Sequence, residues 1–265
     1  MPLSGRLETV SQDTPFGMDW LATPLGRRCL TNEQRLMRRA LERVFGEQLL
    51  QIGAWGPRNS FLRYARTQRR ALVDWRRGVA ADLVCDPERL AVASDSVDVV
   101  VLPHTLERTA SPHALLREVD RVLRPDGHLV VLSFAPGGLW GLRHLLSSGG
   151  YPEGRDRAVR EGRLRDWLEL LSFDVPPATR YCHTLPIERF KQLRFLPREE
   201  LAQRWLPMFS GGYLLKAQKR VQPLTPVRLW KRQPRLRVVG ELVEPTTRAP
   251  VRIVPHPGAE RPERS

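Results

Sequence analysis

The sequence predicts an α/β fold built on a mostly parallel sheet. Apolar segments of strand length alternate with amphipathic helical patterns along the chain. The segment SVDVVVLPH, residues 96–104, is almost continuously apolar and rich in β-branched residues, which indicates a strand buried on both faces. A turn with two glycines follows the apolar segment 48–53, as is typical of open α/β sheets that bind ligands. The length of 265 residues fits one large domain with appendages.

The first helix is predicted over residues 31–46, TNEQRLMRRALERVFG. Thr31 and Gln34 have the spacing of a capping box, and Gly46 is a natural end. The apolar residues of one helix face are Met37, Ala40, Leu41, Val44 and Phe45.

Three short strands are expected next, over residues 48–53, 70–75 and 81–86, with a short helix over 59–66. Only residues 75–81 separate the second strand from the third, whereas a parallel crossover normally takes about a dozen residues or more. We therefore expect the second crossover helix to be absent or shortened.

The clearest helix is SPHALLREVDRVLRPDG, residues 111–127. Ser111 is the expected N-cap and Pro112 the first helical residue, while Pro125 and Gly127 are expected to end the helix. Further elements are predicted as a strand over 128–134, a helix over 162–173 and a last strand over 211–219.

Three regions are predicted: an N-terminal lead and helix (1–46), a central domain (47–220) and a basic tail (221–265), the tail being set apart by its composition. The formal net charge is +14, and residues 216–265 hold 12 Lys and Arg, 4 Asp and Glu, and 8 Pro. A disordered basic tail is expected, which suits nucleic acid as a partner, although a solvated tail without a defined partner is the commoner situation.

Localisation is predicted to be cytoplasmic. The three cysteines form no CxxC pair, so neither a zinc site nor a disulfide framework is indicated. The first residues lack the apolar stretch of a signal peptide, and no apolar run approaches the ~20 residues that a membrane span requires. The chain is thus expected to bind no metal and to cross no membrane.

A candidate nucleoside site is formed by the glycine turn and a following acid. Gly53 and Gly56 let a ligand approach the backbone, because a Cβ would collide with it. Asp74 follows Gly53 by 21 residues, near the spacing at which an acid binds ribose hydroxyls. A simple strand-end role for Asp74 is the alternative.

The segment from Asp86 to Phe134 resembles the class I S-adenosylmethionine-dependent methyltransferases, in particular the subgroup called methyltransferase type 11. The resemblance rests on Asp86, LAVASDSVDVVV, HTLER and RVLRPDG, which follow the order of that family's motifs. The close match covers about 50 residues, and a weaker match in strand order extends over residues 49–217.

This resemblance implies a Rossmann-like, doubly wound sheet and S-adenosylmethionine as methyl donor. The acceptor stays unidentified, and the loop 137–154 is a candidate lid or acceptor loop. Direct methyl displacement depends on alignment and exclusion of water, so no catalytic residue is named. The positions expected at the donor are Gln51, Gly53, Ala54, Trp55, Asp74, Asp86, Pro87, Leu102 and His104.

The first turn departs from the family pattern. Gln51 stands where the family has an acid, so it carries no charge to offset the donor's cationic groups. Trp55 and Pro57 occupy later glycine positions, and Trp55 either forms a pocket wall or fills the pocket. A methyltransferase-fold protein that has lost activity and serves as a binding module is therefore the alternative function. His104 is a candidate general base or a structural hydrogen-bonding residue.

Overall fold

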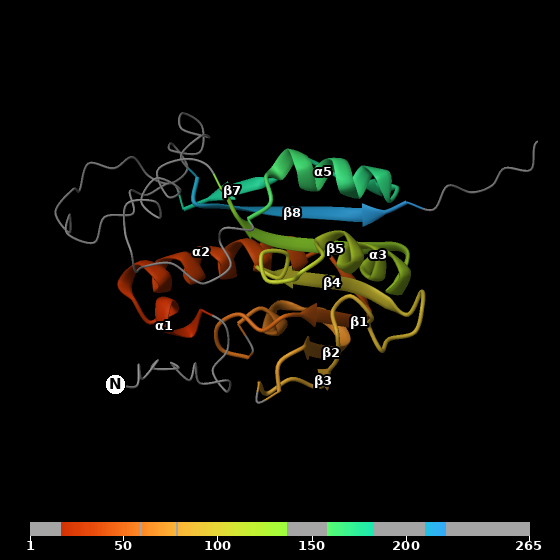
Figure 1. Cartoon of the computed structure of the whole chain (residues 1–265), viewed down its shortest axis with the longest axis horizontal. Coiled ribbons are helices and arrows are strands. Elements are labelled where there is room, and N and C mark those ends of the chain that lie inside the picture. The colour runs from red at the N-terminus through yellow and green to blue at the C-terminus, as the bar shows by residue number, and fades with distance from the viewer. Residues whose placement is uncertain (1–16, 59, 78, 137–157, 183–209, 221–265) are drawn as a thin grey trace, which may run out of the picture. The chain divides into compact units, whose positions relative to one another are not determined.

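The computed structural model describes residues 17–58, 60–77, 79–136, 158–182 and 210–220 (Figure 1). These ranges all lie within a single compact unit, Met1–Pro223. The predicted acceptor loop and basic tail lie outside the described residues, so both stay predictions.

One eight-stranded sheet forms the centre of this unit, as the sequence predicts for the fold class. The strand order is β3-β2-β1-β4-β5-β8-β6, with β7 also paired to β8; the first five strands in this order are parallel, and β8 is antiparallel to its neighbours. The strands are β1 (Phe45–Ile52), β2 (Arg66–Asp74), β3 (Leu83–Val84), β4 (Val97–Pro103), β5 (Leu123–Phe134), β6 (Phe173–Asp174), β7 (Thr179–Tyr181) and β8 (Gly212–Lys219).

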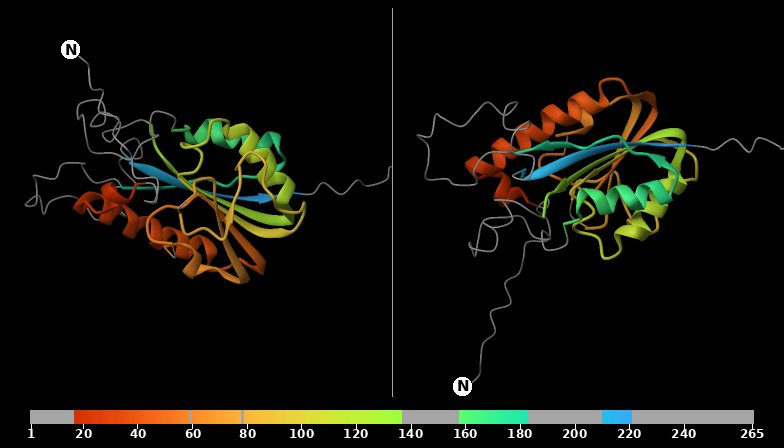
Figure 2. Two further views of the ribbon diagram at one scale, coloured as in Figure 1. Left: turned by 60° about the horizontal axis from the view of Figure 1, so that its bottom comes forward. Right: turned by 90° about the horizontal axis from the view of Figure 1, so that it is seen from above.

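Helices cover both faces of the sheet (Figure 2). On one face lie α1 (Met18–Leu21) and α2 (Pro24–Leu41); on the other lie α3 (Pro112–Val122) and α5 (Glu161–Leu170). Each face has its own apolar core, and the strands between them are buried on both sides, which explains the near-continuous apolar pattern of β4.

The helix α2 begins seven residues before the predicted start at Thr31. Its N-cap is Thr23, whose hydroxyl accepts a hydrogen bond from Gly26 N at 3.0 Å, and Pro24 is the first helical residue. The hydroxyl of Thr31 instead donates to Arg27 O within the helix. The capping-box prediction is therefore wrong, because Thr23 and Pro24 form a better start signal upstream.

The start of α3 is confirmed and its end is corrected. Ser111 is the N-cap, and its hydroxyl accepts from Ala114 N at 3.4 Å. The helix ends at Val122, before the predicted Pro125, because Leu123 is already extended and pairs with Val97 of β4. Strand pairing at this buried position thus prevails over the turn signal of Pro125.

The predicted loss of the second crossover helix is confirmed. Between β2 and β3 the described residues, which exclude only Gly78, form bends and a turn and no helix. The short return is possible because β3 pairs only with the last two residues of β2, Val73 and Asp74. The short helix predicted over 59–66 is a single 3-10 turn, η1 (Leu62–Tyr64). Across the described ranges, no helix is long and apolar enough to span a bilayer.

Candidate functional site

The turn after β1 contains the first residues that were predicted to bind the methyl donor. Gly53 has a φ of 90°, and a Cβ there would lie 2.8 Å from Thr105 Oγ1 and 3.5 Å from Arg108 Nη1, so both conformation and space favour glycine. Gln51 donates from Nε2 to Gly53 O at 3.0 Å. The buried Oε1 of Gln51 has no hydrogen-bond partner among the described residues, so it is available to a ligand that donates.

Asp74 ends β2 with a carboxylate that is 0% exposed. Its Oδ2 accepts from Ala54 N at 2.8 Å, and its Oδ1 accepts from Arg76 N at 3.0 Å and from Arg76 Nε at 3.4 Å. Arg108 Nη2 lies 4.0 Å from Oδ2. The acid predicted to bind ribose is thus held against the glycine turn and close to two guanidinium groups.

Arg108 lies between the glycine turn and the end of β2. Its side chain is 5% exposed, donates from Nη1 to Ala54 O at 3.0 Å, and has its guanidinium 4.4 Å from the centre of the Trp75 ring. Burial and the charge of Arg76 lower the pKa of Arg108 to about 10, so it is cationic at neutral pH. A cation therefore lies beside both the Gly53 turn and the Asp74 carboxylate.

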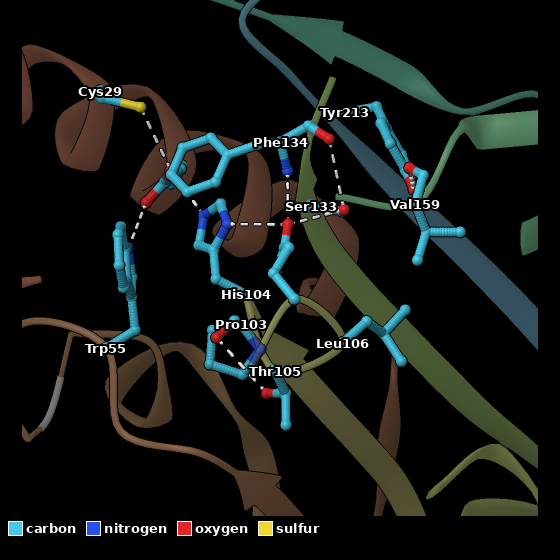
Figure 3. Close-up of polar contacts among 12 residues, drawn as sticks. Cys29, Trp55, Pro103, His104, Thr105, Leu106, Ser133, Phe134, Val159 and Tyr213 are labelled. Atoms are coloured by element: carbon cyan, nitrogen blue, oxygen red, sulfur yellow. Dashed lines mark hydrogen bonds and ion pairs between the residues drawn. The ribbon is translucent and has the colours of Figure 1, made fainter. Parts of the chain in front are cut away.

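Trp55 fills the neighbouring space at the end of β4 (Figure 3). Its side chain is 1% exposed, and its ring centre lies 4.3 Å from that of His104 and 5.9 Å from that of Phe134. The rings of His104 and Phe134 stack with centres 3.9 Å apart. Of the two alternatives for Trp55, the structure thus favours a side chain that fills the space beside His104.

Glu33 of α2 reaches this aromatic group and accepts hydrogen bonds from several donors. Its Oε1 lies 3.1 Å from His104 Nε2, and its Oε2 accepts from Trp55 Nε1 at 2.8 Å. Oε1 also accepts from the Tyr181 hydroxyl at 3.0 Å and from Cys29 Sγ at 3.2 Å. A buried carboxylate on α2 therefore ties this helix to the ends of β4 and β7.

Glu107 faces His104 from the other side. Its Oε1 lies 3.5 Å from His104 Nδ1 and accepts from Ser133 Oγ at 2.8 Å and Phe134 N at 2.7 Å. Burial alone would lower the pKa of His104, but the carboxylates of Glu33 and Glu107 raise it to about 9. Burial opposes ionisation of both glutamates, but His104 brings their pKa values below the ordinary range. An imidazolium between two carboxylates has no free lone pair, so this arrangement is not that of a general base.

The other residues predicted to bind the methyl donor make no described contact with the cluster of Glu33, His104 and Glu107. Asp86 is exposed, and its Oδ1 accepts from Glu88 N at 2.9 Å, which is a turn-capping contact. Pro87 is buried, and Leu102 belongs to the apolar core on the α3 side of the sheet. The structure brings together Gly53, Ala54 and Asp74, while the donor-binding roles of all these positions stay predictions.

Sequence reasoning missed Glu33 and Arg108. Glu33 had one usable signal, because it lies four residues from both Cys29 and Met37 on the buried side of α2, and an acid there needs a buried partner. Arg108 had no such signal in the sequence, because its contacts with Ala54 and Asp74 depend on which loops meet at the edge of the sheet. Over the described ranges, no group of three or more His, Cys, Asp or Glu is placed to hold a metal ion.

Comparison with known proteins agrees with this fold. Residues 48–131 match the family model described as "Methyltransferase domain". A S-adenosylmethionine-dependent methyltransferase from Archaeoglobus fulgidus has a similar structure, with a TM-score of 0.55 and 16% identity over 77% of this chain and 97% of that chain. A geranyl diphosphate methyltransferase complex is similar with a TM-score of 0.50 and 13% identity, over 72% and 78% of the two chains. The chain thus has the fold of the class I S-adenosylmethionine-dependent methyltransferases, and residues 48–131 match the methyltransferase domain model, in agreement with the resemblance.

A relative in sequence is "Uncharacterized protein YafS" of Escherichia coli (strain K12). It is 37% identical over 168 residues, which are 60% of this chain and 65% of that protein. The match therefore spans slightly less than two thirds of the relative's length.

Proposed function

We propose that this protein binds S-adenosylmethionine between the Gly53 turn and Asp74 and transfers its methyl group to a still unidentified acceptor. The observation that carries the proposal is the contact between Ala54 N and Asp74 Oδ2, because it brings the two halves of a nucleoside site together at the carboxyl edge of the sheet. The unpaired Gln51 Oε1 also suits a ligand that donates a hydrogen bond.

Each of these groups has a defined task in the proposed complex. Asp74 accepts hydrogen bonds from ribose hydroxyls, and Gln51 Oε1 accepts from a donor group of the methionine end. S-adenosylmethionine supplies an electrophilic methyl group on sulfonium. The protein's contribution is to align this ligand and to exclude water, so it needs no base of its own.

Arg108 must move for this ligand to enter. Its hydrogen bond to Ala54 O and its proximity to Asp74 compete with the ribose for the same space. Breaking one hydrogen bond to a charged group costs about 1.5–3 kcal/mol, which corresponds to roughly a tenfold or greater loss of affinity. We therefore expect Arg108→Ala to bind S-adenosylmethionine and S-adenosylhomocysteine at least about tenfold more tightly than the native protein.

Isothermal titration calorimetry on the native protein, Arg108→Ala and a control, Arg117→Ala, tests this proposal. Arg117 is an exposed residue of α3, so its replacement should leave the affinity unchanged. Equal or weaker binding by Arg108→Ala would contradict the displacement of Arg108.

A second candidate function is a binding module that has lost its donor site. The burial of Trp55, its hydrogen bond to Glu33 and its contact with His104 favour this candidate, because the protein's own side chains fill space beside β4. Absence of binding heat up to millimolar ligand, in both the native protein and Arg108→Ala, would support this second candidate over the first.

A further inference from the structure

The outward side of α2 carries a line of arginines. Arg28, Arg35 and Arg39 are exposed and are spaced by seven and four residues, so they share one side of the helix. We call these three residues the α2 basic stripe. With a rise of 1.5 Å per residue, the stripe extends over about 16 Å. The only acid within α2 is Glu33, which lies on the opposite, buried side.

The α2 basic stripe has no acidic partner within the described residues. Among the described residues, no carboxylate lies within ion-pair distance of a stripe residue, and Arg35 donates only to Asn32 Oδ1 at 3.5 Å. Eight arginines elsewhere in the domain do have such carboxylate partners, namely Arg58, Arg76, Arg108, Arg121, Arg124, Arg165, Arg180 and Arg220. Other exposed arginines, among them Arg27 and Arg38 of α2 itself, share this lack of a described carboxylate partner and extend the same basic surface. The stripe is thus a face of uncompensated positive charge on a rigid element.

We propose that the α2 basic stripe binds the phosphodiester backbone of double-stranded nucleic acid. Guanidinium groups bind phosphate oxygens in a bidentate manner, and sequence-independent affinity for duplexes comes mainly from such contacts. The outward stripe contains no aromatic residue, so it lacks the stacking platform that single strands require. The inference concerns a face away from Gly53 and Asp74 and does not depend on methyl transfer.

An anionic membrane surface fits this face less well. Helices that lie on membranes insert an apolar side into the lipid, whereas the apolar side of α2 is packed in the protein core through Met37 and Leu41. The large apolar residues that are exposed within the described ranges are Phe45, Val84 and Leu170, none of which lies on α2.

The test uses the full-length chain, so that the basic tail is the same in every sample. The first variant carries Arg28→Gln, Arg35→Gln and Arg39→Gln. The matched control carries Arg89→Gln, Arg117→Gln and Arg160→Gln, which are exposed positions with no ion pair to any described carboxylate. Both variants lose three positive charges, so they differ only in where the charge is removed.

Fluorescence anisotropy with a labelled 24-base-pair duplex measures binding over a range of salt concentrations. We expect the stripe variant to bind at least tenfold more weakly at 0.1 M salt, and the slope of log K against log salt to fall in magnitude by about 3. The control variant should change affinity less than threefold. Equal losses in both variants, or no duplex binding by the native protein, would overturn the proposal. Stripe-dependent binding to phosphatidylglycerol vesicles without duplex binding would overturn it too. Urea unfolding midpoints establish that both variants are folded.

Discussion

The substitution Glu33→Gln removes the charge that joins α2 to the carboxyl edge of the sheet. Each described group that faces this carboxylate donates a hydrogen bond, from His104, Trp55, Tyr181 and Cys29. The amide nitrogen of glutamine would therefore face a donor, and the imidazolium of His104 would keep only one carboxylate. Removing one partner of a buried ion pair costs about 3–5 kcal/mol, so we expect a loss of this size in the free energy of unfolding.

Urea unfolding followed by tryptophan fluorescence measures this loss, because Trp20 and Trp55 are both buried in the native state. Glu47→Gln is the matched control. The Glu47 carboxylate is 61% exposed and lies 3.3 Å from Arg124, so its replacement should cost below about 1 kcal/mol. A loss below about 1 kcal/mol for Glu33→Gln as well would refute the view that the buried ion pair holds α2 in place.

Three further predictions concern the same region. His104 has a pKa of about 9 in the folded protein against about 6.5 when unfolded, so its ionisation contributes stability that is complete below pH 6.5 and is lost as pH rises through 9. The free energy of unfolding of the native protein should fall by about 3 kcal/mol between pH 6 and pH 10 because of this group. If His104→Gln showed the same dependence of unfolding on pH, the raised pKa of His104 would be contradicted. Trp55→Phe removes a donor from a buried carboxylate and should cost about 1–3 kcal/mol, whereas an unchanged urea midpoint would show that this hydrogen bond contributes nothing. Gly53→Ala forces a side chain into a φ of 90° and should destabilise the protein by about 1–3 kcal/mol. The control Gly162→Ala on α5, where a Cβ meets nothing within 4 Å, should be neutral or stabilising. Similar melting temperatures for the two variants would count against strain at Gly53.

Local patterns predicted most of the fold. The apolar run of β4 and the Ser111–Pro112 start of α3 are short-range signals, and the structure confirms both. The absence of the second crossover helix was predicted from the short connection between the second and third strands alone. The predicted start of α2 was wrong because two capping signals compete within one segment. The strands β6 and β7 were not predicted, because segments of two or three residues carry too little periodicity.

The site was predictable only in part. Gly53 and Asp74 were placed together correctly, since both stand at the carboxyl ends of adjacent parallel strands. The positions of Arg108 and Glu33 depend on side chains that arrive from distant elements and compensate buried charges. Such long-range contacts leave no periodic pattern in the sequence, so sequence alone could not indicate that the Arg108 guanidinium lies 4.0 Å from the Asp74 carboxylate.

The most direct test of the account is an experimental structure of the protein with S-adenosylhomocysteine. We expect Arg108 to have left Ala54 O and the ribose hydroxyls to donate to the Asp74 carboxylate. A structure in which Arg108 keeps its bond to Ala54 O, with the nucleoside bound elsewhere or not at all at millimolar concentration, would contradict the proposed donor site.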